Sequence, residues 1–162
     1  MKFKNETQLK NFLMQKCRAA VAGTEQKVHN IIDKCLRQFY AQFSPDEYIR
    51  TKQLLHSLVK SKVEPNGKNG YKARVYFDVS LLNYEQGMME LQHTSEHGRY
   101  GWATWDGETV LRVAMESDVP HGGFKKGTAI WTKSQATIQA LGGVYEMLER
   151  ELKMIGVPIV KK

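Results

Sequence analysis

Residues 54–79 read LLHSLVKSKVEPNGKNGYKARVYFDV, and this stretch has the pattern of a β-hairpin. In its second half, apolar and polar residues alternate, which is the period of a strand with one buried face. The two alternating sets there are Tyr71, Ala73, Val75 and Phe77 against Lys72, Arg74 and Tyr76. The corresponding sets in the first half are Ser57, Val59, Ser61 and Val63 against Lys60 and Lys62. Because residues 65–70 contain two Asn-Gly turn signals, we predict hairpin arms at residues 54–64 and 71–79.

A long helical pattern precedes the hairpin, at residues 6–43. Small and apolar residues recur there at spacings of three and four, which is typical of one helix face. These residues are Leu9, Leu13, Cys17, Ala20, Thr24, Val28, Ile31, Cys35 and Phe39. We expect one long helix or two helices in line, with a weak point for a kink or break at Ala22-Gly23-Thr24. Pro45 ends the pattern, because the residue before a proline avoids helical angles.

A second helical pattern follows at residues 134–155. Its apolar stripe consists of Ile138, Leu141, Tyr145, Leu148, Leu152 and Ile155. Thr132 or Ser134 can cap its start, and Gly156 and Pro158 end it. An isolated hairpin is marginally stable in water, so we expect the hairpin and this stripe to share one core.

The composition is that of a globular protein, with 41% hydrophobic and 25% charged residues in 162. We expect a single domain over residues 1–162, with a long helical segment at 1–45 and an α+β body at 46–162. The predicted fold class is α+β: a long N-terminal helix, a small antiparallel sheet built on the β-hairpin, a long irregular loop at residues 80–108, and a C-terminal amphipathic helix packed on the sheet. Because the N-terminus lacks a signal-peptide pattern and no apolar run reaches the roughly 20 residues that span a bilayer, we expect a cytosolic protein without a membrane partner.

The positive charge is concentrated in the first part of the chain. Residues 1–64 contain 12 Lys and Arg against 6 Asp and Glu, whereas residues 65–162 contain 12 against 11. A solvated helix face is the favoured explanation, and a surface that meets phosphate or an acidic protein is the alternative. Cys17 and Cys35 would lie about 27 Å apart on one helix, so they are expected to be small core residues and not a disulfide.

The sharpest chemical motif is His93-Thr94-Ser95-Glu96-His97, which matches the H-x-x-E-H pattern of zinc peptidases. In that pattern, two histidines one helical turn apart bind zinc and the glutamate activates water. Gly98 and Gly101 follow at once and no apolar period surrounds the motif, so two exposed loop histidines are the favoured interpretation. A three-histidine site with His121 is also disfavoured against an ordinary turn histidine.

No nucleophile elbow, Walker loop or dinucleotide fingerprint occurs in the chain. We therefore expect no catalytic, cofactor-binding or metal-binding residues, and the protein is not expected to be an enzyme.

Large aromatic side chains gather in the predicted loop. A domain of this size cannot bury all of them while the loop stays irregular, so they form a candidate inter-chain interface. The interface residues are Tyr84, Tyr100, Trp102 and Trp105. Capping of the protein's own core and stacking on single-stranded nucleic acid are the alternatives.

Over roughly residues 48–155 the chain resembles the tail-completion, or head–tail joining, neck proteins of long-tailed phages and prophages. The resemblance rests on five stretches in a fixed order. They are Tyr48-Ile49-Arg50-Thr51 with Leu54 and Ser57-Leu58, then Val75-Tyr76-Phe77-Asp78, Asn83-Tyr84, Trp105-Asp106-Gly107-Glu108-Thr109-Val110-Leu111, and His121-Gly122-Gly123 leading to Ile130-Trp131.

This resemblance implies a structural role in the virion neck, with the copies arranged as a ring. The implied partners are other copies of the chain, the portal-side connector or adaptor, and the tail tube or tail terminator protein; passing phage DNA is a further one. The implied location is the virion neck, and the host cytoplasm during assembly. It implies no enzymatic activity and no cofactor. The alternative function is a small basic nucleic-acid-binding protein, and a zinc peptidase through His93, Glu96 and His97 is a remote one.

Overall fold

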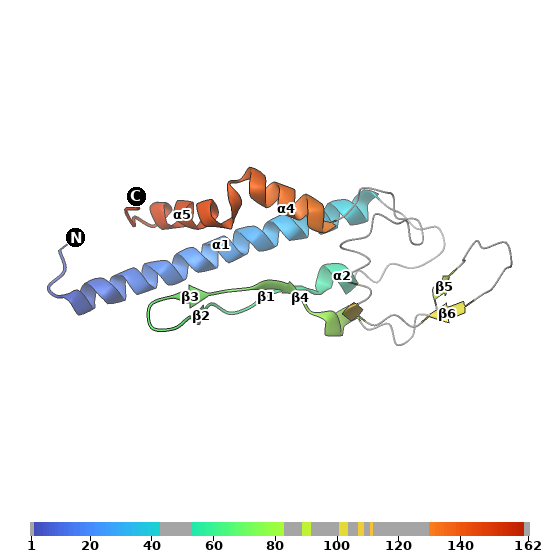
Figure 1. The fold of residues 1–162 in the computed structure, drawn as a ribbon, viewed down its shortest axis with the longest axis horizontal. Coiled ribbons are helices and arrows are strands. Elements are labelled where there is room, and N and C mark those ends of the chain that lie inside the picture. The colour runs from blue at the N-terminus through green and yellow to red at the C-terminus, as the bar shows by residue number, and fades with distance from the viewer. Residues whose placement is uncertain are drawn as a thin grey trace. The chain divides into compact units, whose positions relative to one another are not determined.

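The computed structural model has the predicted α+β fold class, with a long N-terminal helix, small antiparallel sheets and C-terminal helices (Figure 1). The residues that it describes are 2–42, 53–82, 89–91, 101–103, 107–108, 111 and 130–160. The chain divides into two compact units. Unit 1 comprises Met1–Ile32, Val59–Tyr76 and Ser134–Lys162, and unit 2 comprises Asp33–Leu58 and Phe77–Lys133.

Helix α1 runs without a break from Glu6 to Gln42, so the first of the two predicted alternatives is correct. Its start is capped by polar side chains. The Gln8 backbone N–H donates to Asn5 Oδ1 at 2.9 Å, and the Lys4 N–H donates to Gln8 Oε1 at 3.0 Å. These bonds satisfy backbone donors that have no partner within the first helical turn.

Burial along α1 follows the predicted face in its middle and C-terminal parts. In unit 1, Ala20 and Thr24 are buried, and in unit 2, Cys35 and Phe39 are buried. Cys35 and the half-buried Cys17 are both free thiols, as the sequence predicted.

The hairpin is formed by four short strands. Strand β1 (Leu58–Lys60) pairs with β4 (Val75–Phe77), and β2 (Glu64–Pro65) pairs antiparallel with β3 (Tyr71–Lys72). The alternation is confirmed: the four predicted inward residues Tyr71, Ala73, Val75 and Phe77 are half-buried, and Lys72, Arg74 and Tyr76 are exposed.

The strands are shorter than the predicted arms 54–64 and 71–79. Residues Gln53–His56 form a short helix, α2, and Val79–Leu82 form a 3₁₀ helix, η1. The Ser57 N–H donates to the Gln53 carbonyl at 2.8 Å and its hydroxyl donates to the Leu54 carbonyl at 2.9 Å. These local bonds close a helical turn, which competes with extension of the strand.

The C-terminal segment is two helices and not the single helix predicted at residues 134–155. Helix α4 spans Ile130–Ala140 and α5 spans Gly143–Met154. Gly142, before α5, and Gly143, its first residue, have φ angles of +88° and +80°, which a continuing right-handed helix does not allow. Thr132 and Ser134 lie inside α4 and do not cap it, whereas the predicted end at Gly156 is confirmed.

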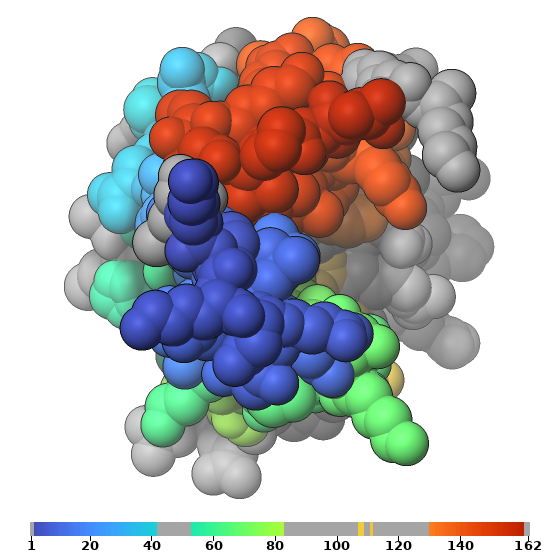
Figure 2. Space-filling view, turned by 90° about the vertical axis from the view of Figure 1, so that its left-hand side faces the viewer, coloured from blue at the N-terminus to red at the C-terminus, as the bar shows by residue number. Residues whose placement is uncertain are grey.

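In unit 1, α1 lies between α5 on one side and the hairpin on the other (Figure 1). The end-on view in Figure 2 shows α1 in blue between the red C-terminal segment and the green hairpin. Side-chain contacts agree with this order. Lys27 of α1 pairs with Glu151 of α5, and Lys60 of the hairpin donates to Gln26 of α1.

Unit 2 contains the C-terminal part of α1, α2, η1 and an antiparallel ribbon. The ribbon joins β5 (Met89–Leu91) to β6 (Gly101–Ala103), so part of the segment predicted as an irregular loop is paired. Its core includes Leu82, which is fully buried. A Cβ atom on Gly107 would lie 2.3 Å from the Val79 carbonyl oxygen, so only glycine fits beside η1.

Candidate functional site

The residues that the sequence singled out fall mostly outside the described residues. Tyr84, Tyr100 and Trp105 of the predicted interface lie there, and so do the His93–His97 motif and His121. Trp102 is part of β6, where its backbone lies opposite Glu90 of β5. Within the described ranges, no group of three or more His, Cys, Asp or Glu side chains is placed to hold a metal ion. No helix in those ranges combines the length and apolar character needed to cross a membrane.

A buried carboxylate joins α5 to α1 in unit 1. Glu151 is 8% exposed, and its Oε1 lies 2.7 Å from Nζ of Lys27. A Cβ atom on Gly23 would lie 2.3 Å from Oε2 of the same carboxylate. Glycine at position 23 therefore makes room for Glu151, and the Lys27 ammonium compensates the charge that burial would otherwise leave unpaired. This arrangement is structural, because the carboxylate is closed in by the two helices.

A shallow groove of about 300 Å³ lies beside this ion pair. Ile31 of α1 and Met147 of α5 supply apolar lining, and Lys27, Asn30 and Arg150 supply polar lining. Leu141, in the turn directly after α4, completes the lining.

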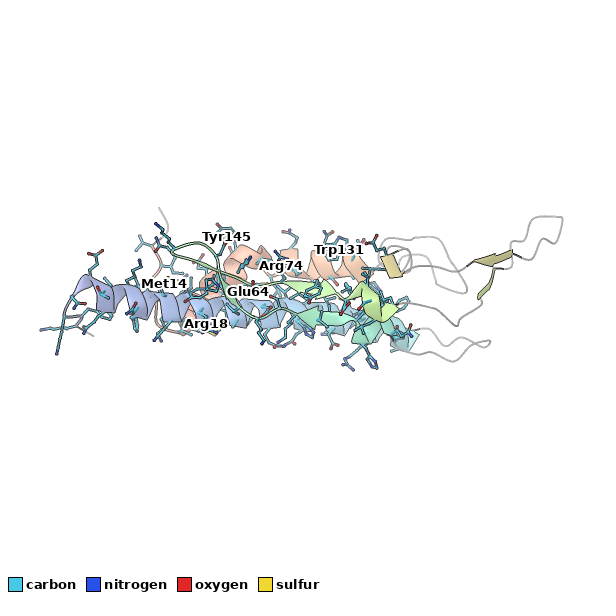
Figure 3. The ribbon with its side chains drawn as sticks, turned by 90° about the horizontal axis from the view of Figure 1, so that it is seen from below. Met14, Arg18, Glu64, Arg74, Trp131 and Tyr145 are labelled. Atoms are coloured by element: carbon cyan, nitrogen blue, oxygen red, sulfur yellow. The ribbon has the colours of Figure 1, made fainter. Side chains whose placement is uncertain are left out.

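The turn between α4 and α5 exposes large apolar side chains, and we call Leu141, Val144 and Tyr145 the α4–α5 corner. Their exposed fractions are 39%, 51% and 89%, respectively. Tyr145 and Leu141 belong to the stripe predicted to face the core, so that part of the prediction is wrong. The break at Gly142–Gly143 is the reason, because it turns α5 so that Met147 and Glu151 face inward instead. Figure 3 labels Tyr145 on α5.

The two units differ in charge. Unit 1 contains 15 Lys and Arg against 6 Asp and Glu, a net charge of +9, and unit 2 contains 9 against 11, a net charge of −2. The sequence did not reveal this contrast, because the charges were compared between residues 1–64 and 65–162. That division separates the two arms of the hairpin. The signal that could have found it is the hairpin itself, in which both arms carry Lys or Arg on the polar face.

The hairpin carries exposed cations on both arms and in its turn, and we call Lys62, Lys68, Lys72 and Arg74 the basic hairpin surface. All four are exposed. Glu64 lies opposite Lys72 across the strands, with 3.9 Å between its Oε2 and the Lys72 Nζ. Figure 3 shows Glu64 and Arg74 on the hairpin.

A protein-family model, YomN, matches residues 5–153, which includes all of α1, the hairpin and α4, and all of α5 except Met154. The chain belongs to the YomN family. This family is derived from a Bacillus phage, so the chain is a phage-associated protein. The phage association implied by the resemblance is thereby confirmed. No curated protein and no solved structure matches the chain.

Proposed function

We propose that this YomN-family protein is a structural protein of the virion, a tail-completion or head–tail joining component that assembles as a ring in the neck. The ring would lie between the portal-side connector or adaptor and the tail tube or tail terminator protein. Assembly would take place in the host cytoplasm. The role needs no catalysis, no cofactor and no membrane.

The observation that carries the proposal is the α4–α5 corner on a protein of a phage-derived family. Tyr145 is 89% exposed and Val144 is 51% exposed, and they lie next to each other at the start of α5. Exposed apolar side chains that gather in one place are typical of surfaces that another protein covers. Tyrosine is also a residue type that contributes strongly to binding energy in interfaces.

A second copy of the chain is the proposed occupant of the corner. A ring requires an interface between two different surfaces of neighbouring copies. The N-terminal part of α1 offers the second surface, because Leu9 and Leu13 are 39% and 38% exposed and lie one helical turn apart. A contact of the corner with this turn would bury apolar area from both copies.

The test combines the mass of the protein in solution with images of the particle. We expect a closed ring by native mass spectrometry and electron microscopy, and labelled protein at the necks of virions. Tyr145→Glu should leave the chain folded and lower the fraction in rings. Tyr76→Glu is the matched control, because Tyr76 is 48% exposed on the hairpin, outside the proposed contact. A chain that stays monomeric at all concentrations and is absent from purified virions would contradict the proposal.

A further inference from the structure

Positive charge is densest in the hairpin. Residues 59–76 contain five Lys or Arg and a single acidic residue, Glu64, which gives a net charge of +4 in 18 residues. All five cations are exposed, whereas Tyr71, Ala73 and Val75 on the alternate positions are half-buried. Lys72 and Arg74 alternate with these half-buried residues and therefore lie on the opposite face of the hairpin, and the Arg74 backbone is held by hydrogen bonds with Ser61. Lys60 lies toward α1, where it donates to Gln26.

The cations of the hairpin differ from those of α5 in their partners. On α5, Arg150 pairs with Glu146 at 3.3 Å and Lys153 pairs with Glu149 at 2.7 Å. On the hairpin, the Lys72 Nζ lies 3.9 Å from the Glu64 Oε2, which is longer than either of these separations.

The remaining cations of the basic hairpin surface lack such a partner. Among the residues that the structure describes, Lys62, Lys68 and Arg74 form no ion pair with a carboxylate. Their charge is left to attract an external anion.

We propose that the basic hairpin surface binds the phosphate backbone of duplex DNA without reading its sequence. A DNA duplex carries one negative charge per about 1.7 Å of its axis. Lys72 and Arg74 are two residues apart on one arm of the hairpin, which separates them by about 6.7 Å, so each can meet a phosphate. Arg74 adds a planar group that can hold a phosphate through two parallel hydrogen bonds.

Duplex DNA fits this surface better than a single strand does. Proteins that hold single strands use several aromatic rings on which successive bases stack. Residues 59–76 offer one exposed ring, that of Tyr76 at 48%, since Tyr71 is half-buried. The proposed binding does not depend on the ring assembly, so each can fail without the other.

The experiment measures binding of the full chain to a fluorescently labelled duplex of arbitrary sequence at increasing NaCl concentration. The test variant is Lys62→Gln/Lys68→Gln/Arg74→Gln. The control variant, Lys34→Gln/Arg150→Gln/Lys153→Gln, removes the same three charges from exposed positions on α1 and α5. Thermal melts of both variants establish that they remain folded. If the triple hairpin variant does not fold, Lys68→Gln alone, in the turn, replaces it as the test variant.

We expect wild type and control to share one slope of log affinity against log salt. The hairpin variant should lose about 2.7 from that slope, since each phosphate contact contributes about 0.9 with B-form DNA; Lys68→Gln alone should lose about 0.9. Equal slopes for the two triple variants, or no binding of wild type to the duplex at low salt, would overturn the proposal. A hairpin variant that keeps its DNA affinity but loses self-association would overturn it in favour of an acidic surface on a second copy.

Discussion

Two glycine-containing sites in the helices of unit 1 behave in opposite ways. Helix α1 passes through Gly23 without interruption, whereas the C-terminal segment breaks at Gly142–Gly143. The sequence reading expected the reverse, a weak point at Gly23 and one continuous helix after residue 134. A glycine in a helical pattern can be needed because a Cβ atom would clash with a neighbouring side chain, or because the backbone takes a positive φ angle. The helix continues in the first case and breaks in the second.

Gly23 serves space. Its backbone is helical, and the position where a Cβ atom would be is taken by the carboxylate of Glu151 on α5. Helical propensity alone would favour alanine here by about 1 kcal/mol. The close approach of a buried charge from another helix outweighs that preference, and nothing within α1 itself encodes it.

Gly142 and Gly143 are needed for their backbone angles. Both have positive φ angles, which cost a residue with a Cβ atom about 1–2 kcal/mol. The turn that they make decides which side chains of α5 face α1. Met147 is 2% exposed and Tyr145 is 89% exposed, although the uninterrupted pattern would have buried the tyrosine.

The largest expected effect tests which side of α5 faces inward. Met147→Ala should lower the free energy of unfolding by about 3 kcal/mol, because it empties a buried position. Tyr145→Ala should change it by less than about 0.5 kcal/mol, because the side chain is exposed. Chemical denaturation of the monomeric chain measures both. If Tyr145→Ala costs more than Met147→Ala, the helix is continuous and the comparison fails.

Much of the fold could be predicted because its signals are local. The period of α1, the alternation of the hairpin and the end of α5 at Gly156 each follow from neighbouring residues, and the structure confirms them. The turn at Gly142–Gly143 was missed because Leu141, Tyr145 and Leu148 keep a helical spacing across it. The spacing of apolar residues along the sequence is the same whether or not the helix axis changes direction, so it cannot reveal the turn.

The candidate sites were less predictable, since they depend on segments distant in the sequence. The charge of unit 1 becomes visible only when Met1–Ile32, the hairpin and Ser134–Lys162 are counted together. The Glu151–Lys27 pair joins positions more than one hundred residues apart. The aromatic interface stays a prediction, because Tyr84, Tyr100 and Trp105 lie outside the described residues.

A double-mutant cycle sharpens the claim about Gly23. In the wild-type chain, Gly23→Ala should lower the free energy of unfolding by about 1 kcal/mol, because the methyl group displaces the Glu151 carboxylate from Lys27. In a Glu151→Ala background the same change should raise it by about 1 kcal/mol, which is the gain in helix propensity. The coupling is then about 2 kcal/mol, measurable by denaturant unfolding of the four chains.

A matched background separates this contact from a general effect on α5. Glu149→Ala removes another carboxylate of the same helix, one that pairs with Lys153. Gly23→Ala should cost as much in that background as in the wild type. A coupling near zero with Glu151, or an equal coupling with Glu149, would mean that glycine at position 23 is not required by the buried carboxylate.

The smallest expected effect concerns Gly143, where space plays no part. The nearest atom to a Cβ there would be the Gln139 Oε1 at 4.0 Å, an ordinary contact distance. Gly143→Ala should therefore cost about 1 kcal/mol through its φ of +80° alone. Gly143→Asn should cost less, because asparagine tolerates left-handed angles better than alanine does. Thermal melts of the two variants against wild type measure the difference.

The decisive comparison is the sign of the change in stability at the two positions. Once Glu151 is removed, alanine should stabilise the chain at position 23 and still destabilise it at position 143, because removing a neighbour frees space but leaves a backbone angle unchanged. Stabilisation by alanine at both positions would show that the C-terminal segment can continue as one helix.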